Sequence, residues 1–583
     1  MTAIATISVI LDGEQYTNVL SLQLEQYLHM PHGFELMVPG NWLQQQHTPE
    51  QLVQRLLGKQ LEINLQTGSR QKNTFRGLVT SVHINATAAG HGSCIVKGSS
   101  PDITLHRTAA MQVFENKSAA TLAKDFTTSL RQTNISPKAH EPIPYLLQCQ
   151  ETNLLLLQRI AVLYKEWCFY DGTTFHFGNY QPAYISLQTG IQLLDFEISV
   201  AMPAPAAQVH CFDYMLSSQQ YATVKDLPKD NYLHHLFDEV TVLNNASTLI
   251  SAGASAESEA IMQQAVDKQT RTLFTQGLQL RGRSIHAGIR PGDIIRVEPA
   301  DKSKSYGDFR VMAVRHFMTG DHSYYNTFQA ISTAVEAPGY NVETPRCHGQ
   351  SAVVTDNEDP ENLGRVKVRY QWQTTGSSPW MRIMQPVAGN GKGWYFLPEI
   401  NEEVWIGYEQ QHSDKPFVAG SFYNNSQRPA PAAVQNNLKV IRSRSGHTIT
   451  LDDTPGAEQV HIADKGGNQL LLDTSSGTMQ LQAPELITLH SKNILLKADA
   501  AVTLAAAGDV SISAASNLYQ YATATAVLSA GELSLITDKQ LSLFAAELKA
   551  VSENAALHST KGDFLIKSAK ALHIQGEEKI NMH

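Results

Sequence analysis

At 583 residues and 64.2 kDa, the chain is too long for a single hydrophobic core, and ordinary domain sizes predict about three to five domains. Lys plus Arg total 45 against 54 for Asp plus Glu, and the formal charge of −9 argues against a nucleic-acid binder. No apolar run reaches the roughly 18 residues of a membrane-spanning helix, and the first residues lack a signal-peptide layout. The five cysteines are odd in number and far apart, so we expect reduced, mostly buried thiols of a protein made in the cytoplasm.

Residues 1–95 alternate short β-rich runs with turns, and one helix interrupts them. Thr48 and Gln51 have the spacing of a capping box around Pro49, and Gly58 supplies a stop. The pattern predicts a β domain with one short helix.

Residues 96–340 add helices to this β-rich head. Ser118 and Thr152 stand at the start of predicted helices, and a further helix is expected around 255–271. Strands and turns return from 276 to 335, with Pro291-Gly292-Asp293 as a clear turn. We expect an α+β or mainly β head in which every helix serves core packing.

Residues 346–424 contain five or six short strand candidates joined by polar turns, which predicts a small closed barrel. After it, Arg428-Pro429-Ala430-Pro431 reads as a short stiff linker.

From residue 485 onward there is no proline and no tryptophan, and apolar positions recur near every eighth residue. These positions are Leu486 and Leu489, Ile494 and Leu496, Val502 and Leu504, Val510 and Ile512, Leu533 and Leu535, Leu541 and Leu543, Leu548 and Val551, Leu557, Leu565, and Leu572 and Ile574. Most pairs lie two residues apart, so a β-solenoid fits better than a coiled coil, although the register slips between Val510 and Leu533. Either three successive octads of one chain form a coil, or three chains share one prism; the periodicity does not separate these cases.

A collinear series of motifs in the barrel segment carries a family resemblance. It runs through Asp356, Asp359-Pro360, Gly364-Arg365-Val366-Lys367-Val368, Trp372, Trp380-Met381-Arg382, Gly393, Glu403-Val404, Gly407-Tyr408, Lys415-Pro416 and Gly420-Ser421-Phe422-Tyr423-Asn424. This order resembles the OB-fold of VgrG-type spike proteins of contractile injection systems, which are related to the phage baseplate hub and tail spike. The strands around His447–Asp453 resemble their neck, and the helix after Glu151 resembles part of their hub.

The resemblance implies a mainly β fold with two β-barrel hub domains, helical insertions, an OB-fold and a C-terminal trimeric β-helix of octad repeats. The expected domains are hub β-barrel 1 at 1–95, a hub connecting region with helices at 96–245, hub β-barrel 2 at 246–340, the OB-fold at 341–427, neck strands at 428–485 and the β-helix spike at 486–583.

The function implied is that of a structural homotrimeric needle that caps the inner tube and punctures target membranes while delivering effectors. The resemblance implies tail-tube and baseplate partners at the hub end, assembly in the cytoplasm and secretion or injection on sheath contraction. Type VI secretion, an extracellular tailocin-like device and a prophage tail spike all fit this architecture.

No enzyme motif accompanies these features, and we expect no catalytic residue and no cofactor. Gly389–Gly393 lacks the Ser or Thr of a phosphate loop and reads as a barrel turn, and Glu358 and Asp359 read as a solvated turn. The alternative, a carbohydrate-processing β-solenoid enzyme, needs acidic or basic side chains clustered on one solenoid face, whereas the charges here are single and of mixed sign.

The last octads are the expected tip. Three copies of a histidine on a threefold axis could hold a metal, and His573 and His583 are weak candidates. Leu572, Ile574, Ile580 and Met582 would form a blunt apolar platform. In the family that the chain resembles, a separate PAAR-type protein covers this platform, so we expect a tip partner and non-covalent effectors.

Overall fold

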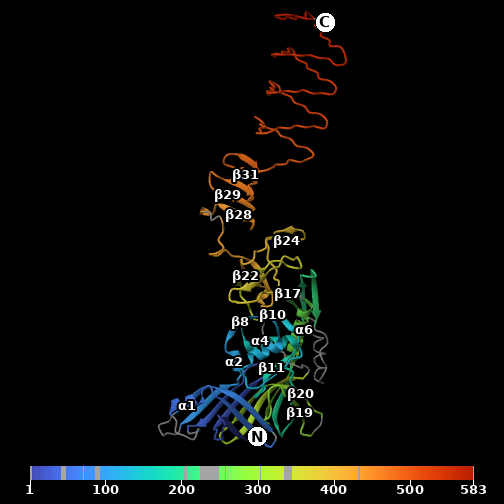
Figure 1. Cartoon of the computed structure of the whole chain (residues 1–583). Coiled ribbons are helices and arrows are strands. Elements are labelled where there is room, and N and C mark those ends of the chain that lie inside the picture. Colours follow the sequence, from blue (N-terminus) through green and yellow to red (C-terminus); the bar gives the residue numbers. More distant parts are fainter. Residues whose placement is uncertain are drawn as a thin grey trace. The chain divides into compact units, whose positions relative to one another are not determined.

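The computed structural model describes the chain except residues 1–2, 41, 43–47, 70, 86–91, 202–206, 224–247, 256–257, 302–303, 334–344, 431–433 and 582–583. The chain divides into two units, Met1–Asn437 and Leu438–His583. The first unit is mainly β within the described residues, and the second begins with a five-stranded sheet (Figure 1). No helix in this described part is long and apolar enough to cross a membrane.

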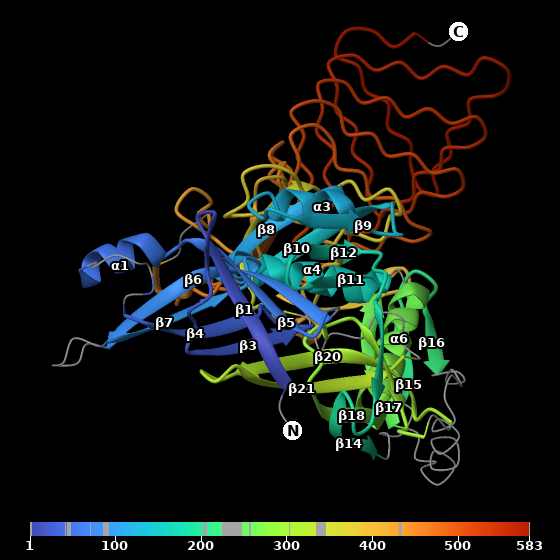
Figure 2. The ribbon, with the colours of Figure 1, turned by 90° about the horizontal axis from the view of Figure 1, so that it is seen from below.

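A closed ring of eight strands forms the first hub barrel. The strands are β1 (Ala3–Leu11), β5 (Gln60–Thr67), β6 (Gln71–Asn85), β7 (Ser93–Ser99), β4 (Gly33–Pro39), β3 (Ser21–Tyr27), β20 (Gly307–Met318) and β21 (Ser323–Ser332), and β2 (Glu14–Tyr16) pairs with β1. Figure 2 shows the blue N-terminal strands beside the yellow-green β20 and β21. Because β20 pairs with β3 and β21 pairs with β1, the barrel closes only through strands more than two hundred residues away in the sequence.

The same two strands belong to the second hub barrel. Its path runs through β13 (Tyr184–Gln188), β19 (Ile294–Glu298), β20, β21, β18 (Leu278–Ser284) and β14 (Leu193–Val200). The two hub barrels therefore share β20 and β21, while the expected domain boundaries stay predictions.

Between the barrel strands lies the connecting region. Its elements are α2 (Ile103–His106), β8 (Ala109–Ser118), α3 (Ala119–Phe126), β9 (Thr133–Ser136), β10 (Pro142–Thr152), α4 (Asn153–Tyr164), β11 (Trp167–Tyr170) and β12 (Phe175–Gly178). The helix α1 (Pro49–Leu56) lies earlier in the chain, between β4 and β5. The predicted helix starts are confirmed, because the side chains of Thr48, Ser118 and Thr152 each accept a hydrogen bond from a backbone N–H of the first turn.

A small insertion completes the hub. In it, β16 (Ser218–Thr223), β15 (Ala207–Asp213) and β17 (Thr248–Ser255) form one sheet that contacts α6 (Ser258–Gly277), the helix predicted around 255–271 (Figure 2).

The OB segment packs its own core within the first unit. Its main sheet has the order β23 (Lys367–Tyr370), β22 (Gln350–Asp356), β26 (Glu403–Tyr408) and β27 (Pro416–Ser421). The hairpin of β24 (Ala388–Gly389) and β25 (Lys392–Gly393) confirms the predicted turn, and short 3₁₀ segments lie at Glu409–Gln411 and Val434–Asn436.

The second unit begins with a five-stranded antiparallel meander. Its strands are β28 (Leu438–Arg442), β29 (Thr448–Asp452), β30 (Gln459–Ala463), β31 (Gln469–Asp473) and β32 (Thr478–Gln482). Residues 483–581 follow without an assigned strand or a backbone-to-backbone hydrogen bond within the single chain. The β-helix expected there stays a prediction.

The expectation that all cysteines are free thiols is wrong for two of the five. Cys149 and Cys347 form a disulfide with a Cα–Cα distance of 6.1 Å, whereas Cys94, Cys168 and Cys211 are buried and take part in no disulfide. A sequence separation of 198 residues gives no local signal for this pairing.

Candidate functional site

The meander of β28–β32, here called the neck sheet, has one face made almost entirely of aliphatic side chains. Two cross-strand rows lie on this face: Ile441, Ile449, Ile462, Leu470 and Leu481, and beside them Leu451, Val460, Leu472 and Met479. Directly opposed side chains such as these are the packing units of a sheet. The other face is mixed, and one of its cross-strand rows contains Val440, Thr450, His461, Leu471 and Gln480.

Nothing within the described residues of the second unit buries the aliphatic face. Ile462 is 42% exposed, Met479 68% and Leu481 55%. Burial of one such side chain contributes about 1.5–3 kcal/mol, and a sheet with one apolar face needs a second layer. The neck sheet therefore has an uncovered apolar face within the described residues of the second unit.

Residues 483–581, here called the shaft, follow an extended path with regularly spaced bends (Figure 1). The bends fall at 484–485, 492, 499–500, 507–508, 515–516, 523–524, 531–532, 538–539, 546–547, 553–554, 560–562, 569–570 and 577–578. The spacing continues between Val510 and Leu533, so the register slip expected there does not interrupt the repeat of bends. Apolar side chains such as Val510, Ile512 and Leu533 are exposed by more than half in the single chain.

The joint between the hub and the OB segment is polar as well as apolar. Arg159 of α4 donates to Glu151 at 2.7 Å and lies 3.3 Å from Asp414 of the OB segment. The Glu115 carboxylate of β8 accepts a hydrogen bond from the backbone N–H of Ser377 at 2.9 Å. Burial raises the pKa of Glu151, and the charge and hydrogen bond of Arg159 offset part of this rise. These contacts fix the OB barrel on the hub.

The turn expected to be solvated at Glu358 and Asp359 is instead built around a buried ion pair. The Asp359 and Arg365 side chains are only 3% and 8% exposed, and Arg365 Nη2 donates to Asp359 Oδ1 at 2.7 Å. Hydrogen bonds from Arg365 hold the pKa of Asp359 well below its usual range. Asp359 is thus a structural anion and a poor acid catalyst.

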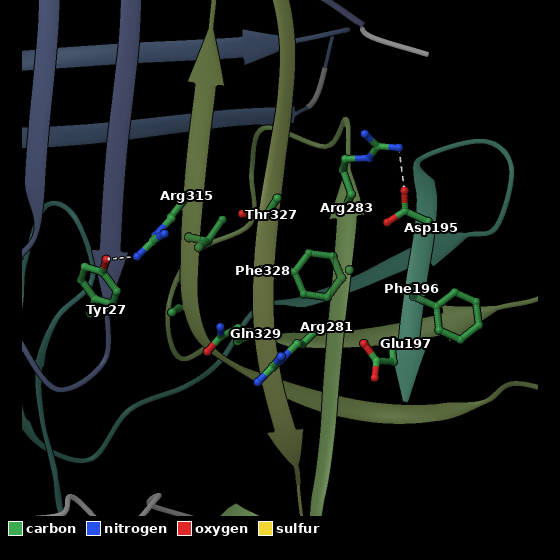
Figure 3. A pocket seen from close by; sticks show the side chains of 13 residues that line it. Tyr27, Asp195, Phe196, Glu197, Arg281, Arg283, Arg315, Thr327, Phe328 and Gln329 are labelled. Atoms are coloured by element: carbon green, nitrogen blue, oxygen red, sulfur yellow. Dashed lines mark hydrogen bonds and ion pairs between the residues drawn. The ribbon is translucent and has the colours of Figure 1, made fainter. Parts of the chain in front are cut away.

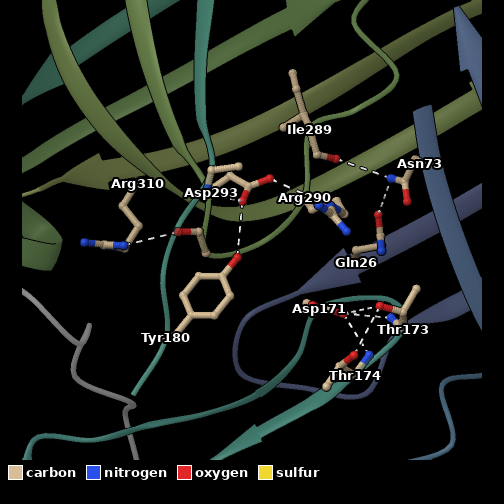
Figure 4. A network of polar contacts seen from close by, with 12 residues as sticks. Gln26, Asn73, Asp171, Thr173, Thr174, Tyr180, Ile289, Arg290, Asp293 and Arg310 are labelled. Atoms are coloured by element: carbon tan, nitrogen blue, oxygen red, sulfur yellow. Dashed lines mark hydrogen bonds and ion pairs between the residues drawn. The ribbon is translucent and has the colours of Figure 1, made fainter. Parts of the chain in front are cut away.

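A fully buried polar network lies where the two barrels share strands (Figure 4). Asn73 Nδ2 donates to Gln26 Oε1 at 2.9 Å and lies 3.2 Å from His316 Nε2, while His316 Nδ1 lies 2.8 Å from the Tyr324 hydroxyl. Burial lowers the pKa of His316 to about 3 and that of nearby His32 to about 4, so both rings are neutral at neutral pH.

Sequence analysis missed this network, although a signal exists. Gln26 continues the inward positions of Leu22 and Leu24 in β3, and His316 lies between the buried Val314 and Met318 in β20. A polar residue at an inward position of an alternating strand predicts a buried hydrogen-bonded group.

A second polar cluster surrounds the predicted turn at Gly292 (Figure 4). Gly292 has φ +90°, and a Cβ there would lie 2.9 Å from the Phe169 ring. Asp293 is 1% exposed and accepts hydrogen bonds from the Tyr180 hydroxyl at 3.2 Å and the Ala183 backbone N–H at 3.1 Å. Burial raises the Asp293 pKa to about 6. Asp293 and Arg290 also line a cavity of about 330 Å³ with Asp171 and His176.

Asp171 in this cavity has hydrogen-bond partners at both carboxylate oxygens. Its carboxylate accepts from the Thr173 and Thr174 backbone N–H groups at 2.8 Å and lies 2.9 Å from His176 Nε2. The pKa of Asp171 is lowered because its hydrogen bonds and the neighbouring His176 outweigh its burial. The arrangement locks the turn between β11 and β12.

A groove of about 720 Å³ lies on the shared barrel strands and is lined by ion pairs (Figure 3). Arg283 Nη2 lies 2.7 Å from Asp195 Oδ2, and Arg315 donates to the Tyr27 hydroxyl at 3.2 Å. Arg281 faces Glu197 across the strands β18 and β14. The groove is lined by side chains of both charges, and its lining also includes Phe328.

The residues expected at the tip lie in the shaft. Leu572, Ile574 and Ile580 are 54%, 57% and 47% exposed, while Met582 and His583 lie outside the described residues. His573 is exposed, and within the described residues no three His, Cys, Asp or Glu side chains gather as a metal site.

Two family descriptions match parts of this chain. The type VI secretion system and phage-baseplate injector OB domain matches residues 350–423, and the phage tail baseplate hub (GPD) matches residues 32–170. The first lies inside the expected OB-fold, and the second covers much of the first barrel and the connecting region.

Individual relatives agree with these matches. The chain is 22% identical over 491 residues to the type VI secretion system spike protein VgrG1a of Pseudomonas aeruginosa, which covers 73% of each protein. It is also 22% identical over 160 residues to the actin cross-linking toxin VgrG1 of Vibrio cholerae, covering 25% of this chain and 15% of the toxin.

Among solved structures, a chain of the lidded Francisella PdpA-VgrG complex is similar with a TM-score of 0.54 and 10% identity, covering 82% of this chain and 79% of that one. At this identity the likeness shows the fold alone.

Proposed function

We propose that this chain, a VgrG-type spike protein of a contractile injection system, acts as the non-enzymatic homotrimeric needle of that apparatus. In this proposal the hub caps the inner tube and contacts tail-tube and baseplate proteins, and the shaft leads through the target membrane. The protein is assembled in the cytoplasm and leaves the cell on sheath contraction.

The exposed aliphatic face of the neck sheet is the observation that supports the proposed trimer. Nine aliphatic side chains in two rows cannot remain exposed to water in a stable protein, and a second and third copy of the same face would cover them. Three identical sheets related by a threefold axis bury this face without any other partner.

The shaft favours shared winding over a single-chain coil. In a coil formed by one chain, successive turns would lie about 4.8 Å apart and would be joined by backbone hydrogen bonds. No such bond joins residues 483–581 of one chain. Strands from two further chains, inserted between the turns, would supply the missing partners and complete the trimeric β-helix.

At the distal end we propose that Leu572, Ile574, Ile580 and Met582 bind a PAAR-type tip protein, through which non-covalent effectors are carried. Within the described residues the last octads keep the apolar pattern of the rest of the shaft. No resident metal or cofactor is part of the proposal.

Sedimentation of the purified full-length chain tests the trimer, and its release into the medium tests the needle. We expect a mass of three chains at all concentrations in the micromolar range, and release that stops when the sheath cannot contract. A folded monomer contradicts the trimer, and release independent of contraction contradicts the role as an injected needle.

A further inference from the structure

Strand β10 separates two hydrophobic cores, and the core on its OB side contains one cysteine from the hub and one from the OB segment. Leu146 of β10 belongs to the hub core, whereas Leu147 and Cys149 belong to the OB core together with Cys347. Both cysteines are 2% exposed. The Cys149–Cys347 bond therefore connects the hub to the first residues of the OB barrel.

Local backbone structure aims both sulfur atoms at this joint. A β-bulge follows Cys149, where Gln150 has φ +52°, and bulges redirect neighbouring side chains. The backbone N–H of Cys347 donates to the Gln411 carbonyl at 2.8 Å. The Cα–Cα distance of 6.1 Å lies within the range in which a disulfide closes without backbone movement.

The joint does not depend on the bond for its assembly. Arg159 connects Glu151 with Asp414, and Glu115 binds the Ser377 backbone, so the two cysteines are held together by non-covalent contacts on both sides. The other three cysteines are also buried, but they take part in no disulfide.

We propose that Cys149 and Cys347 form a conditional cross-link, open in the reducing compartment where the spike is assembled and closed once the spike meets oxidising conditions. The oxidant is a low-molecular-weight or protein disulfide. One cysteine thiolate attacks it and forms a mixed disulfide, and one thiol leaves. The second cysteine then displaces the second thiol, so two electrons and two protons pass from the pair to the oxidant. The cross-link locks the OB barrel onto the hub.

Redox titration of the full-length chain tests the cross-link without reference to the proposed function. The chain is equilibrated with reduced and oxidised glutathione, trapped in acid, alkylated after unfolding and mapped by peptide mass. We expect five alkylated cysteines under reducing conditions and three under oxidising conditions, with Cys149 and Cys347 in one linked peptide. Five alkylated cysteines under both conditions, or a different linked pair, overturns the proposal.

Matched variants distinguish the contribution of Cys149 and Cys347 from that of the other three cysteines. Cys149→Ser and Cys347→Ser should each abolish the linked peptide, whereas Cys168→Ser should leave it intact. In the wild-type chain, amide exchange in β10 and at residues 347–350 should be at least about tenfold slower in the linked form than in the reduced form. Equal exchange rates would show that the bond does not lock the joint.

The inference that the bond stays open inside the cell and closes outside it rests on the proposed function, and a separate measurement tests it. Alkylation inside cells should trap five thiols, while spike recovered from the medium after sheath contraction should contain the linked peptide. A linked peptide already present inside cells overturns this inference. Failure to find any spike outside contradicts the proposed function, and the glutathione titration then decides the cross-link on its own.

Discussion

At the scale of single residues, the buried histidines His32 and His316 make the hub sensitive to acid. Both have pKa values lowered by burial, to about 4 and about 3, from 6.5. Below pH 6.5 the unfolded chain binds protons that the folded chain does not, so stability falls as the pH decreases towards these values. The slope is at most about 1.4 kcal/mol per pH unit for each histidine.

Thermal unfolding between about pH 7.5 and about pH 4.5 should therefore show a falling midpoint for the hub transition. Asp293 works in the opposite direction, because its raised pKa means that the folded state binds its proton first. The double variant His32→Gln and His316→Gln should flatten the pH dependence, although it starts from a lower midpoint. An unchanged slope in this variant would assign the acid sensitivity to other groups.

The ion pair at the joint offers a second residue-scale prediction. Arg159→Met would leave the carboxylate of Glu151, which is 4% exposed, without its cation. Loss of one partner of a buried pair costs about 3–5 kcal/mol, and denaturant unfolding should show it as an early transition of the joint. Arg296→Met is the control, because Arg296 is half-exposed beside Asp308 and its pair contributes at most about 1 kcal/mol. Equal effects of the two variants would contradict the structural role of Arg159.

What the sequence predicts at this scale depends on how local the signal is. The helix caps at Thr48, Ser118 and Thr152 depend only on neighbouring residues, because each side chain accepts a hydrogen bond from the backbone N–H three residues later. The structure confirms all three caps. Cys149 meets Cys347 only through the folded joint, so no spacing rule could find the pair. We predicted a solvated Asp359 because the sequence alone does not show that the turn folds back and brings Arg365 to this carboxylate.

At the scale of elements, the neck sheet allows a test within one strand. Leu470 of β31 lies in the aliphatic row between Ile462 and Leu481, whereas the next residue, Leu471, faces His461 and Gln480. Leu470→Asp would place three carboxylates in the shared interior of a trimer, where unpaired charge is strongly unfavourable. Sedimentation should show monomers for Leu470→Asp and trimers for Leu471→Asp. A trimeric Leu470→Asp protein would place the contact face elsewhere.

Element pairing explains why the hub could be predicted only in part. The alternating patterns in residues 1–95 and 276–335 correctly indicate strands, because each pattern is local. The sharing of β20 and β21 between both barrels is a long-range property, set by which strand edges remain unpaired. The OB-fold was easier, because its motifs lie together within one continuous segment that the family description matches.

At the scale of the whole molecule, the shaft forms no strand within a single chain. Its bends recur every seven to nine residues, as the octad pattern predicts, yet its backbone groups find no partners within the chain. In the proposed trimer, the periodic apolar positions would contact the other two copies, whose strands would supply the missing backbone partners.

The tip provides the last prediction. Truncation after Ala569 removes Leu572, Ile574 and Ile580 but leaves the neck sheet and most octads, so the trimer should persist in sedimentation. The truncated spike should no longer retain a tagged PAAR-type protein that the full chain retains, because the apolar platform is gone. His573→Ser is the matched control: it lies between Leu572 and Ile574, so it should keep the tip protein unless a metal at His573 is required. Retention of the tip protein by the truncated trimer would place the docking site elsewhere on the spike.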